Sequence, residues 1–320
     1  MAKPIRLYIA GHGGMVGQAL YRLFKTDPAY QLITATRAEL DLTNQAAVRQ
    51  FFAVQQPDYV VIAAAKVGGI AANATQPVEF LLENLQIATN VLEAAYQHQC
   101  KRVLFLGSSC IYPRDSLQPI NEEQLLSGPL ESTNDAYAIA KIAGLRLCRA
   151  YQQQYGADFR ALMPTNLYGP FDNFSPTQSH VLPALLHRFH MQRQSGQPIQ
   201  IWGSGQPLRE FLHVDDLAAA CKFVLELPSV VYWSSVKDCG GFLNVGSGEE
   251  VTIRQLAYTI AQVTGFHGEI DFDRSKPDGT PRKLLDCRRI ATLGWQAQIK
   301  LSDGIANTYT WYQQQTDLRL

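Results

Sequence analysis

The sequence predicts an α/β protein with a doubly wound parallel sheet, covered by helices on both faces, and a smaller α+β region. From Ile5 to about Ala161, short β-branched runs alternate with longer stretches of helical spacing, which is typical of a parallel sheet. A glycine-rich turn directly follows the first of these runs. After Tyr168 the alternation stops, and residues 169–179 collect Gly, Pro, Asn and Asp, which indicates that a second region begins.

The strands of the first region are expected at the β-branched runs, each of about five or six residues, the usual strand length. They fall at residues 5–10, 31–35, 59–63, 102–107 and 159–164. Helices are expected between them. The helix over about 77–98 begins with proline in its first turn and carries apolar residues at helical spacing, so we expect it to pack on the sheet.

The pattern of the second region is mixed. Residues 210–227 are expected to form a strand followed by a helix, with Asp215 or Asp216 as the N-cap. Residues 242–245 are expected to form a short strand that can return to the first sheet.

Composition excludes several classes of protein. The chain has 320 residues, of which 46% are hydrophobic and 18% charged, so it suits a soluble globular protein and not a disordered or fibrous one. Its 28 basic and 28 acidic residues balance, which leaves no long-range field to attract nucleic acid or an anionic membrane. Any anion site is therefore expected to be local, and we predict no nucleic-acid or membrane partner.

The cysteines and the amino terminus indicate a cytoplasmic protein. The six cysteines include no C-x-x-C pair, so reduced thiols are the simpler interpretation, and we predict no metal site. The first residues do not form a signal peptide. The most apolar stretch, residues 60–72, is shorter than a bilayer span and contains Lys66.

The glycine-rich turn predicts a dinucleotide site. It has the form G-x-x-G-x-x-G, with Gly11, Gly14 and Gly17 between the first strand and a helix. Glycines let the backbone approach a pyrophosphate, whose charge is favoured at a helix N-terminus. Three spaced glycines are weak evidence alone, because tight turns also use them, but the preceding strand and the following helix favour a Rossmann-like nucleotide fold.

The end of the second strand indicates which dinucleotide is bound. Arg37 stands where an NAD-preferring fold normally carries an acidic residue, which favours the 2′-phosphate of NADP. The alternative is that Arg37 is a solvated surface residue, because Glu39 and Asp41 are close in sequence. Asp41 and Leu42 can instead line the adenine.

Tyr137 and Lys141 form a Y-x-x-x-K motif, which places both side chains on one face of a helix. A lysine at this spacing can lower the pKa of the phenol, so that tyrosine exchanges a proton with a carbonyl oxygen. The motif is common by chance. Here it follows the segment 107–112, Gly-Ser-Ser-Cys-Ile-Tyr, at the carboxyl end of a strand, where open α/β sheets bind ligands.

Several longer sequence motifs make the chain resemble the extended short-chain dehydrogenase/reductase family over nearly its whole length. Besides the two motifs above, they are Ala-Ala-Ala-Lys-Val-Gly-Gly-Ile at 63–70, residues 163–170, Ser-His-Val at 179–181, Trp-Gly-Ser-Gly at 202–205, residues 209–216 and Lys-Pro-Asp-Gly-Thr-Pro-Arg-Lys at 276–283. The resemblance implies NADP(H) as cofactor and GDP-4-keto-6-deoxy-D-mannose as substrate. It implies epimerisation at C3 and C5 of the sugar, followed by NADPH-dependent reduction at C4.

The resemblance also implies the catalytic residues, which are Ser108, Cys110, Tyr137, Lys141 and His180. Cys110 is the expected base and His180 the expected acid of the epimerisation, because their ordinary pKa values permit proton exchange near neutrality. Tyr137 and Ser108 stabilise an enolate oxygen, and Tyr137 then protonates the reduced ketone while Lys141 holds the nicotinamide ribose. The alternatives are a packing role for Cys110, a structural role for His180, and a purely local role for Ser109.

The binding residues follow from the same resemblance. Arg188, Trp202, Arg209, Asp278 and Lys283 are implicated in holding the nucleotide sugar. Cations suit the diphosphate, and the tryptophan can pack against sugar or base, although Trp202 can also be a core or loop anchor and Asp278 a turn residue before glycine. The residues implied to hold NADP(H) are Gly11, His12, Gly13, Gly14, Met15, Val16, Gly17, Arg37, Asp41, Leu42, Leu106, Gly107, Ser108, Ser109, Tyr137, Lys141, Pro164, Thr165, Asn166, Leu167 and His180.

One position departs from the family pattern. Gly13 stands where relatives often carry an arginine that helps to hold the 2′-phosphate, so only Arg37 is left of that pair. We therefore expect a weaker preference for NADPH over NADH than relatives have.

The resemblance also implies how the chain is divided. Residues 1–168 and about 211–246 are expected to form the NADP-binding domain, and about 169–210 with 247–320 the substrate domain. The helices at 77–98 and 136–155 are expected to pair across a two-fold homodimer interface. Two other functions remain open: an NAD⁺-dependent nucleotide-sugar epimerase or dehydratase without net cofactor turnover, and a catalytically silent binding protein that kept the fold.

Overall fold

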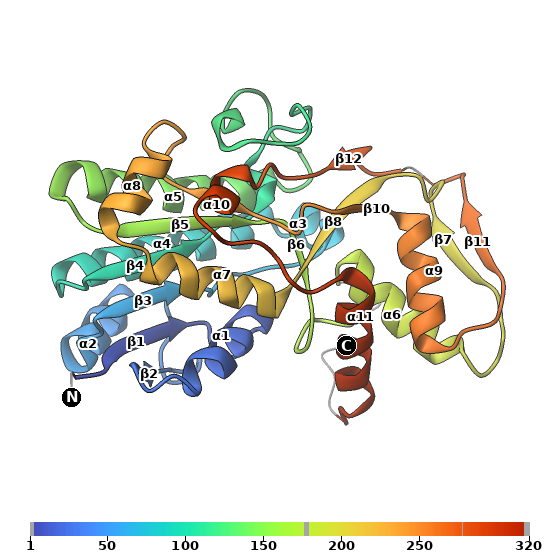
Figure 1. Ribbon diagram of the computed structural model, residues 1–320, viewed down its shortest axis with the longest axis horizontal. Helices are drawn as coiled ribbons and strands as arrows, with labels where there is room; N and C mark the ends of the chain where they lie inside the picture. Colours follow the sequence, from blue (N-terminus) through green and yellow to red (C-terminus); the bar gives the residue numbers. More distant parts are fainter. Residues whose placement is uncertain (1–2, 176–178, 277, 317–320) are drawn as a thin grey trace.

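The computed structural model describes residues 3–175, 179–276 and 278–316 (Figure 1). Six strands form a central parallel sheet in the order β2-β1-β3-β4-β5-β9. Their bounds are β1 Ile5–Ala10, β2 Tyr30–Ile33, β3 Tyr59–Ile62, β4 Arg102–Leu106, β5 Phe159–Pro164 and β9 Leu243–Val245. The predicted α/β class with a doubly wound parallel sheet is confirmed.

Helices cover both faces of this sheet (Figure 1). One apolar core lies between the sheet and the helices α1 (Met15–Lys25), α7 (Val214–Glu226) and α8 (Ser229–Val236). The core on the opposite face is filled by α2 (Gln45–Gln55), α4 (Pro77–Gln97) and α5 (Asp135–Tyr155). The short helices α3 (Ile70–Thr75) and α10 (Arg288–Thr292) and the 3₁₀ turns at Ser109–Ile111 and Glu122–Gln124 complete this part.

A second group of elements lies beyond the carboxyl ends of the central strands, at the right of Figure 1. Its main sheet is formed by β10 (Glu250–Thr252), β8 (Leu208–His213) and β12 (Arg282–Lys283), with β6 (Asn166–Tyr168) also paired to β8. A separate pair joins β7 (Ile199–Trp202) to β11 (Ile270–Asp273). The helices α6 (Val181–Gln192), α9 (Ile253–Thr264) and α11 (Leu301–Gln313) enclose the third apolar core.

The chain passes between these two groups repeatedly. Strand β8 belongs to the second sheet, but the helix α7 that follows it packs beside α1, where Arg22 donates to Asp215 at 2.6 Å. Strand β9 then pairs with β5 in the central sheet, as the sequence suggested for residues 242–245.

The start of α7 differs from the expected one. Its N-cap is His213, whose Nδ1 accepts the backbone N–H of Asp215 at 3.2 Å, so the prediction of Asp215 or Asp216 as N-cap was wrong. The two carboxylates have other partners. Asp215 accepts from Arg22, and Asp216 accepts the backbone N–H of Ile299 at 2.9 Å.

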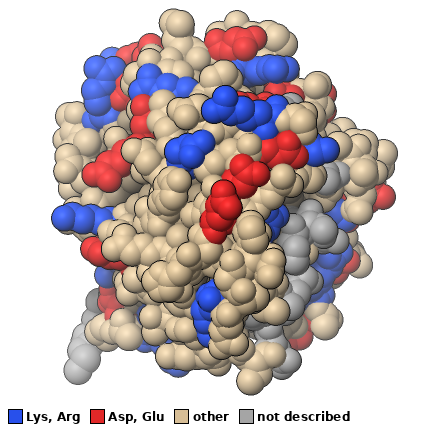
Figure 2. Space-filling model, turned by 90° about the vertical axis from the view of Figure 1, so that its right-hand side faces the viewer, with Lys and Arg blue, Asp and Glu red and all other residues tan. Residues whose placement is uncertain are grey.

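The surface carries charges of both signs. Figure 2 looks onto the end of the molecule that lies at the right of Figure 1, where acidic and basic side chains are interspersed among neutral ones. Over the described ranges, no helix is both long enough and apolar enough to cross a membrane.

Candidate active site

The turn between β1 and α1 is built around glycines that cannot be replaced without strain. Gly11 has a φ of +88°, and a Cβ atom at Gly17 would lie 2.1 Å from the carbonyl oxygen of Gly11. The N–H of Gly14 donates to that same oxygen at 3.1 Å, which closes the turn. A backbone held so close to a helix N-terminus fits the pyrophosphate of a dinucleotide.

The loops after β2 and β3 meet beside this turn. The side chain of Arg37 is 78% exposed and lies 3.5 Å from the carboxylate of Glu83 on α4, which also binds Lys66 at 3.0 Å. The carboxylate of Asp41 accepts from the N–H and hydroxyl of Thr43, which holds its pKa below the usual range. Sequence reasoning missed Glu83, because it is distant from both cations along the chain.

Tyr137 and Lys141 share one face of α5, as the motif predicted. The ammonium of Lys141 lies over the Tyr137 ring, 5.7 Å from its centroid, and donates to the carbonyl of Leu106 at 2.8 Å. The ring of Phe80 packs edge-on against Tyr137, with 6.3 Å between centroids.

The expected lowering of the phenol pKa is not seen. Burial raises the pKa of Tyr137, and the neighbouring Cys110 raises it further. Burial also lowers the pKa of Lys141 to about 8, because desolvation outweighs the opposite effect of the neighbouring Cys110.

Ser108 and Cys110 are fixed by the turn that follows β4. Ser108 is the N-cap of the 3₁₀ turn, and its Oγ accepts the N–H of Cys110 at 3.4 Å. Burial raises the pKa of the Cys110 thiol, while Lys283, Ser108 and Lys141 lower it in that order. Ser109 is buried, and its carbonyl accepts the N–H of Tyr112, so its contacts are local.

His180 and Lys283 belong to the second group of elements, and Lys283 acts electrostatically on both His180 and Cys110. His180 is exposed and directly precedes α6. Desolvation lowers its imidazole pKa, and the positive charge of Lys283 lowers it further. The charge of Lys283 therefore reaches both His180 and Cys110.

Lys283 has a second cation beside it. The register of β12 on β8 pairs Lys283 with Arg209, and across the described parts of the chain neither side chain forms an ion pair with a carboxylate. Burial lowers the pKa of both cations. Two partly buried cations on adjacent strands, acted on by the carboxylates of Asp278 and Glu131 without forming an ion pair with either, are suited to a diphosphate.

The remaining residues predicted to bind substrate come from α6 (Arg188), the end of β7 (Trp202) and the loop before β12 (Asp278). Trp202 is 72% exposed, and the ammonium of Lys276 lies 5.7 Å from its ring centroid. The carboxylate of Asp278 accepts from the N–H and hydroxyl of Ser204, at 2.8 and 2.6 Å. Arg188 donates to the carbonyl of Gln200 at 2.6 Å, which anchors it to β7.

Residues 164–167 connect the two sheets. The N–H of Thr165 donates to the carbonyl of Val245 in the central sheet at 3.0 Å, and Asn166 pairs with Phe211 in the second one. These residues therefore lie at the carboxyl end of β5, where ligands of open α/β sheets bind.

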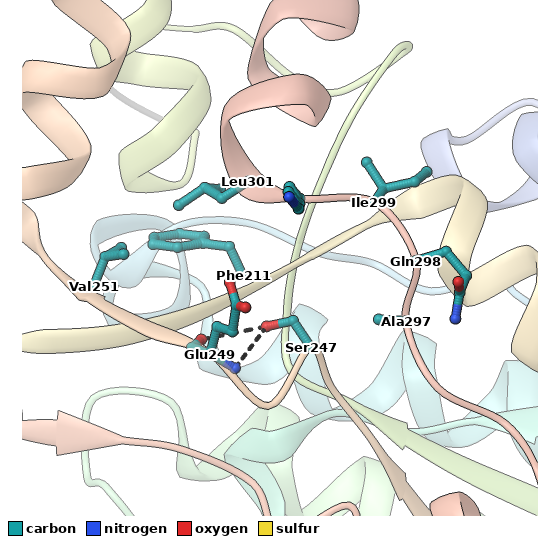
Figure 3. Close-up of a pocket in the computed structure, with 9 residues that line it drawn as sticks. Phe211, Ser247, Glu249, Val251, Ala297, Gln298, Ile299 and Leu301 are labelled. Atoms are coloured by element: carbon teal, nitrogen blue, oxygen red, sulfur yellow. Dashed lines mark hydrogen bonds between the residues drawn. The ribbon is translucent and has the colours of Figure 1, made fainter.

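A small cavity elsewhere does not coincide with this region. About 80 Å³ in volume, it lies between β8, β10 and the segment before α11, and Figure 3 shows Phe211, Ser247 and Leu301 among its lining residues. None of the predicted site residues lines it. Within the part of the chain that the structure describes, no cluster of His, Cys, Asp and Glu is arranged to hold a metal ion.

Comparisons with known proteins find relatives over nearly the whole chain. The family model of the NAD dependent epimerase/dehydratase family matches residues 7–232. The chain is 52% identical over 313 residues to GDP-L-fucose synthase of Escherichia coli (strain K12), covering 98% of each chain. It is 52% identical to GDP-L-fucose synthase 1 of Arabidopsis thaliana, covering 97% of this chain and 94% of that protein.

A solved structure is similar over the whole chain. The GDP-L-fucose synthetase from Naegleria fowleri, bound to NADP, superposes with a TM-score of 0.85 at 28% identity, covering 100% of this chain and 98% of the other.

Proposed function

We propose the function of this protein on the basis that the chain belongs to the NAD dependent epimerase/dehydratase family. It acts as a GDP-L-fucose synthase, which epimerises GDP-4-keto-6-deoxy-D-mannose at C3 and C5 and reduces C4 with NADPH. The observation that supports this proposal is that the charge of Lys283 reaches Cys110 and His180, while Cys110 acts on Tyr137, since these residues can supply both proton exchange and an anion contact.

The nucleotide site fits NADP(H). The close approach at Gly11 and Gly17 suits a pyrophosphate where side chains would fill the turn, and Arg37 lies in the loop after β2, where it can bind a 2′-phosphate. The cofactor supplies a hydride to C4 of the sugar. Lys141, held by the carbonyl of Leu106, is placed to hold the nicotinamide ribose.

Epimerisation uses the ketone at C4. Both epimerised carbons flank that carbonyl, so removal of a proton from C3 or C5 leaves an enolate whose oxygen Ser108 and Tyr137 stabilise by donating hydrogen bonds. Cys110 takes the proton as thiolate, and His180 returns one on the opposite face of the ring. The charge of Lys283 favours the thiolate form of Cys110 and so offsets part of the rise in pKa that burial causes.

The reduction step takes place at the same C4 carbonyl as the epimerisation. As hydride reaches C4, Tyr137 gives its phenolic proton to the ketone oxygen, and the cationic Lys141 beneath the ring stabilises the phenolate that is left. The protein therefore needs one carbonyl site for both stages.

Substrate binding is assigned to the second group of elements. Arg209 and Lys283 hold the diphosphate, with Arg188 contributing from α6, and Trp202 offers an exposed ring for the base or sugar. Asp278 holds the turn at Ser204 beside that ring and keeps lone pairs for a hydroxyl.

We propose the division of the chain expected from the sequence: residues 1–168 with about 211–246 bind NADP(H), and about 169–210 with 247–320 bind the GDP-sugar. We also propose a homodimer, supported by exposed apolar side chains on α4 and α5, among them Leu82 and Ile139. A cytoplasmic location suits cysteines that are all unpaired.

The test is to mix the purified protein with GDP-4-keto-6-deoxymannose and NADPH, follow nicotinamide absorbance and identify the sugar by NMR. Loss of NADPH with formation of GDP-L-fucose is expected. If the sugar changes while NADPH does not, the protein is an epimerase without net reduction. If neither changes, the synthase proposal is wrong.

A further inference from the structure

The carboxylate of Glu83 lies between Lys66 and Arg37, the cation predicted to hold the 2′-phosphate. Its Oε1 is 3.0 Å from the ammonium of Lys66, and its Oε2 is 3.5 Å from the guanidinium of Arg37. Arg37 follows β2, Lys66 follows β3, and Glu83 is in the second turn of α4. One acid therefore connects the two loops that flank the adenosine end of the site.

The two contacts differ in strength. Lys66 and Glu83 are both about three-quarters buried, with side-chain exposures of 27% and 24%, and Lys66 is hydrogen-bonded to Glu83. The backbone of Lys66 is also bonded to the side chain of Asn84, which is on the same helix as Glu83. Arg37 is 78% exposed, and an exposed ion pair at 3.5 Å contributes little stability. Lys66 therefore holds the Glu83 carboxylate in place. The weaker contact between Glu83 and Arg37 can be given up when another anion binds Arg37.

Arg37 has acidic residues near it, which is unusual for a residue that binds a phosphate. The carboxylate of Glu39 accepts from the N–H and hydroxyl of Thr36, directly before Arg37. Asp41 is close enough for the charge of Arg37 to lower its pKa. Two carboxylates, those of Glu83 and Asp41, therefore act on a cation that a 2′-phosphate needs for charge-assisted hydrogen bonds.

The sheet order locates that phosphate. Because β2 is next to β1 in the order β2-β1-β3, the residues after β2 lie beside the glycine turn, where this fold holds the 2′ position of the adenosine ribose. We propose that Glu83 is a specificity-determining residue that competes with the 2′-phosphate for Arg37 and so narrows the preference for NADPH over NADH. The inference rests on the proposed function, which makes NADPH the reductant.

The test measures dinucleotide binding without any sugar. Titration of the protein with NADPH and with NADH, followed by nicotinamide fluorescence, gives the two dissociation constants. In Glu83→Gln the ratio of the NADH constant to the NADPH constant should rise roughly threefold to tenfold, because the guanidinium loses its charged competitor. Glu83→Asp keeps a charge beside Lys66 but shortens its reach toward Arg37, so it should move the ratio in the same direction.

Glu93→Gln is the matched control. It removes the same charge from the same helix about 15 Å further along the axis, where Glu93 binds Arg49 at 2.8 Å. Its ratio should equal that of the unmodified protein. In the Arg37→Gln background, Glu83→Gln should no longer raise the ratio, because the contested cation is gone.

Two results would overturn the inference: an unchanged or lower ratio in both Glu83 variants, or a gain that persists without Arg37. A lower ratio would make Glu83 a residue that positions Arg37 for the phosphate. Intact dinucleotide binding without turnover of the GDP-sugar would refute the synthase proposal alone. Failure of both dinucleotides to bind would refute the synthase proposal and this inference together.

Discussion

Replacing Tyr137 by phenylalanine removes one hydroxyl and leaves the packing against Phe80 in place. Without that proton donor at the ketone oxygen, NADPH-dependent reduction should fall by roughly 10²- to 10⁴-fold. Binding of NADPH, measured by fluorescence titration, should be retained. Turnover equal to that of the unmodified protein would exclude Tyr137 as the proton donor.

The charge of Lys283 should be measurable at the thiol of Cys110. Burial raises the pKa of Cys110 and the charge of Lys283 lowers it, so Lys283→Gln should raise the pKa of this thiol further. Since only the thiolate is alkylated, the pH profile of iodoacetamide reaction at Cys110, followed by peptide mass spectrometry, should move to higher pH.

Arg282→Gln is the control for this shift. Arg282 is adjacent on β12, but its guanidinium is bound to Glu250 at 2.8 Å. Its profile should match that of the unmodified protein. Equal profiles for both variants would show that the charge of Lys283 does not reach Cys110.

Gly13 has room for the arginine that relatives often carry. Apart from Gly13 itself and its two chain neighbours, no heavy atom of the described residues lies within 4 Å of a Cβ atom built on Gly13. Gly13→Arg should therefore fold normally and tighten NADPH binding relative to NADH roughly tenfold, by adding a charge-assisted bond to the 2′-phosphate. Gly13→Ala should leave the ratio unchanged, and an equal ratio in the arginine variant would contradict the assignment of this turn.

Among the helices, α9 has the most completely capped start. The hydroxyl of Thr252 accepts the N–H of Gln255, while the Gln255 side chain accepts the N–H of Thr252. Thr252→Ala should lower the free energy of unfolding by about 1 kcal/mol in urea denaturation. Gln262→Ala, at an exposed position of the same helix, should have little effect. A Thr252→Ala protein as stable as the unmodified one would mean that α9 does not depend on this cap.

Elements that depend on a local sequence pattern could be predicted from the sequence. Contacts between segments far apart in the chain could not. The glycine turn, the central strands and the Y-x-x-x-K helix follow from spacing alone, and their bounds differ from the predicted ones by at most two residues. The pairing of β12 with β8, which places Lys283 beside Arg209, joins segments far apart in the chain. Glu83 was missed for the same reason, because a carboxylate on a helix gives no local signal of the two loops that it binds.

Assembly of the whole molecule can be tested at α4 and α5. Ile139 is 47% exposed and Leu82 50% exposed, which leaves apolar surface on two helices that pack against each other. If these helices form the homodimer interface, Ile139→Glu should give monomers in size-exclusion chromatography with light scattering, because the interface would bury an unpaired charge. Val230→Glu, at a 75% exposed position on α8, should leave the dimer intact. Dimers that persist in both variants would place the interface elsewhere.

Because the chain passes repeatedly between the two sheets, few positions are suitable as junctions in a chimera with a related protein. The polypeptide leaves the central sheet after β5, returns through α7 to β9, and leaves again for β10. No single crossover point therefore separates nucleotide recognition from sugar recognition. A chimera that takes its sugar specificity from a relative has to exchange at least two separate segments together, and a protein truncated after β5 would lose β9 and expose an unpaired strand edge.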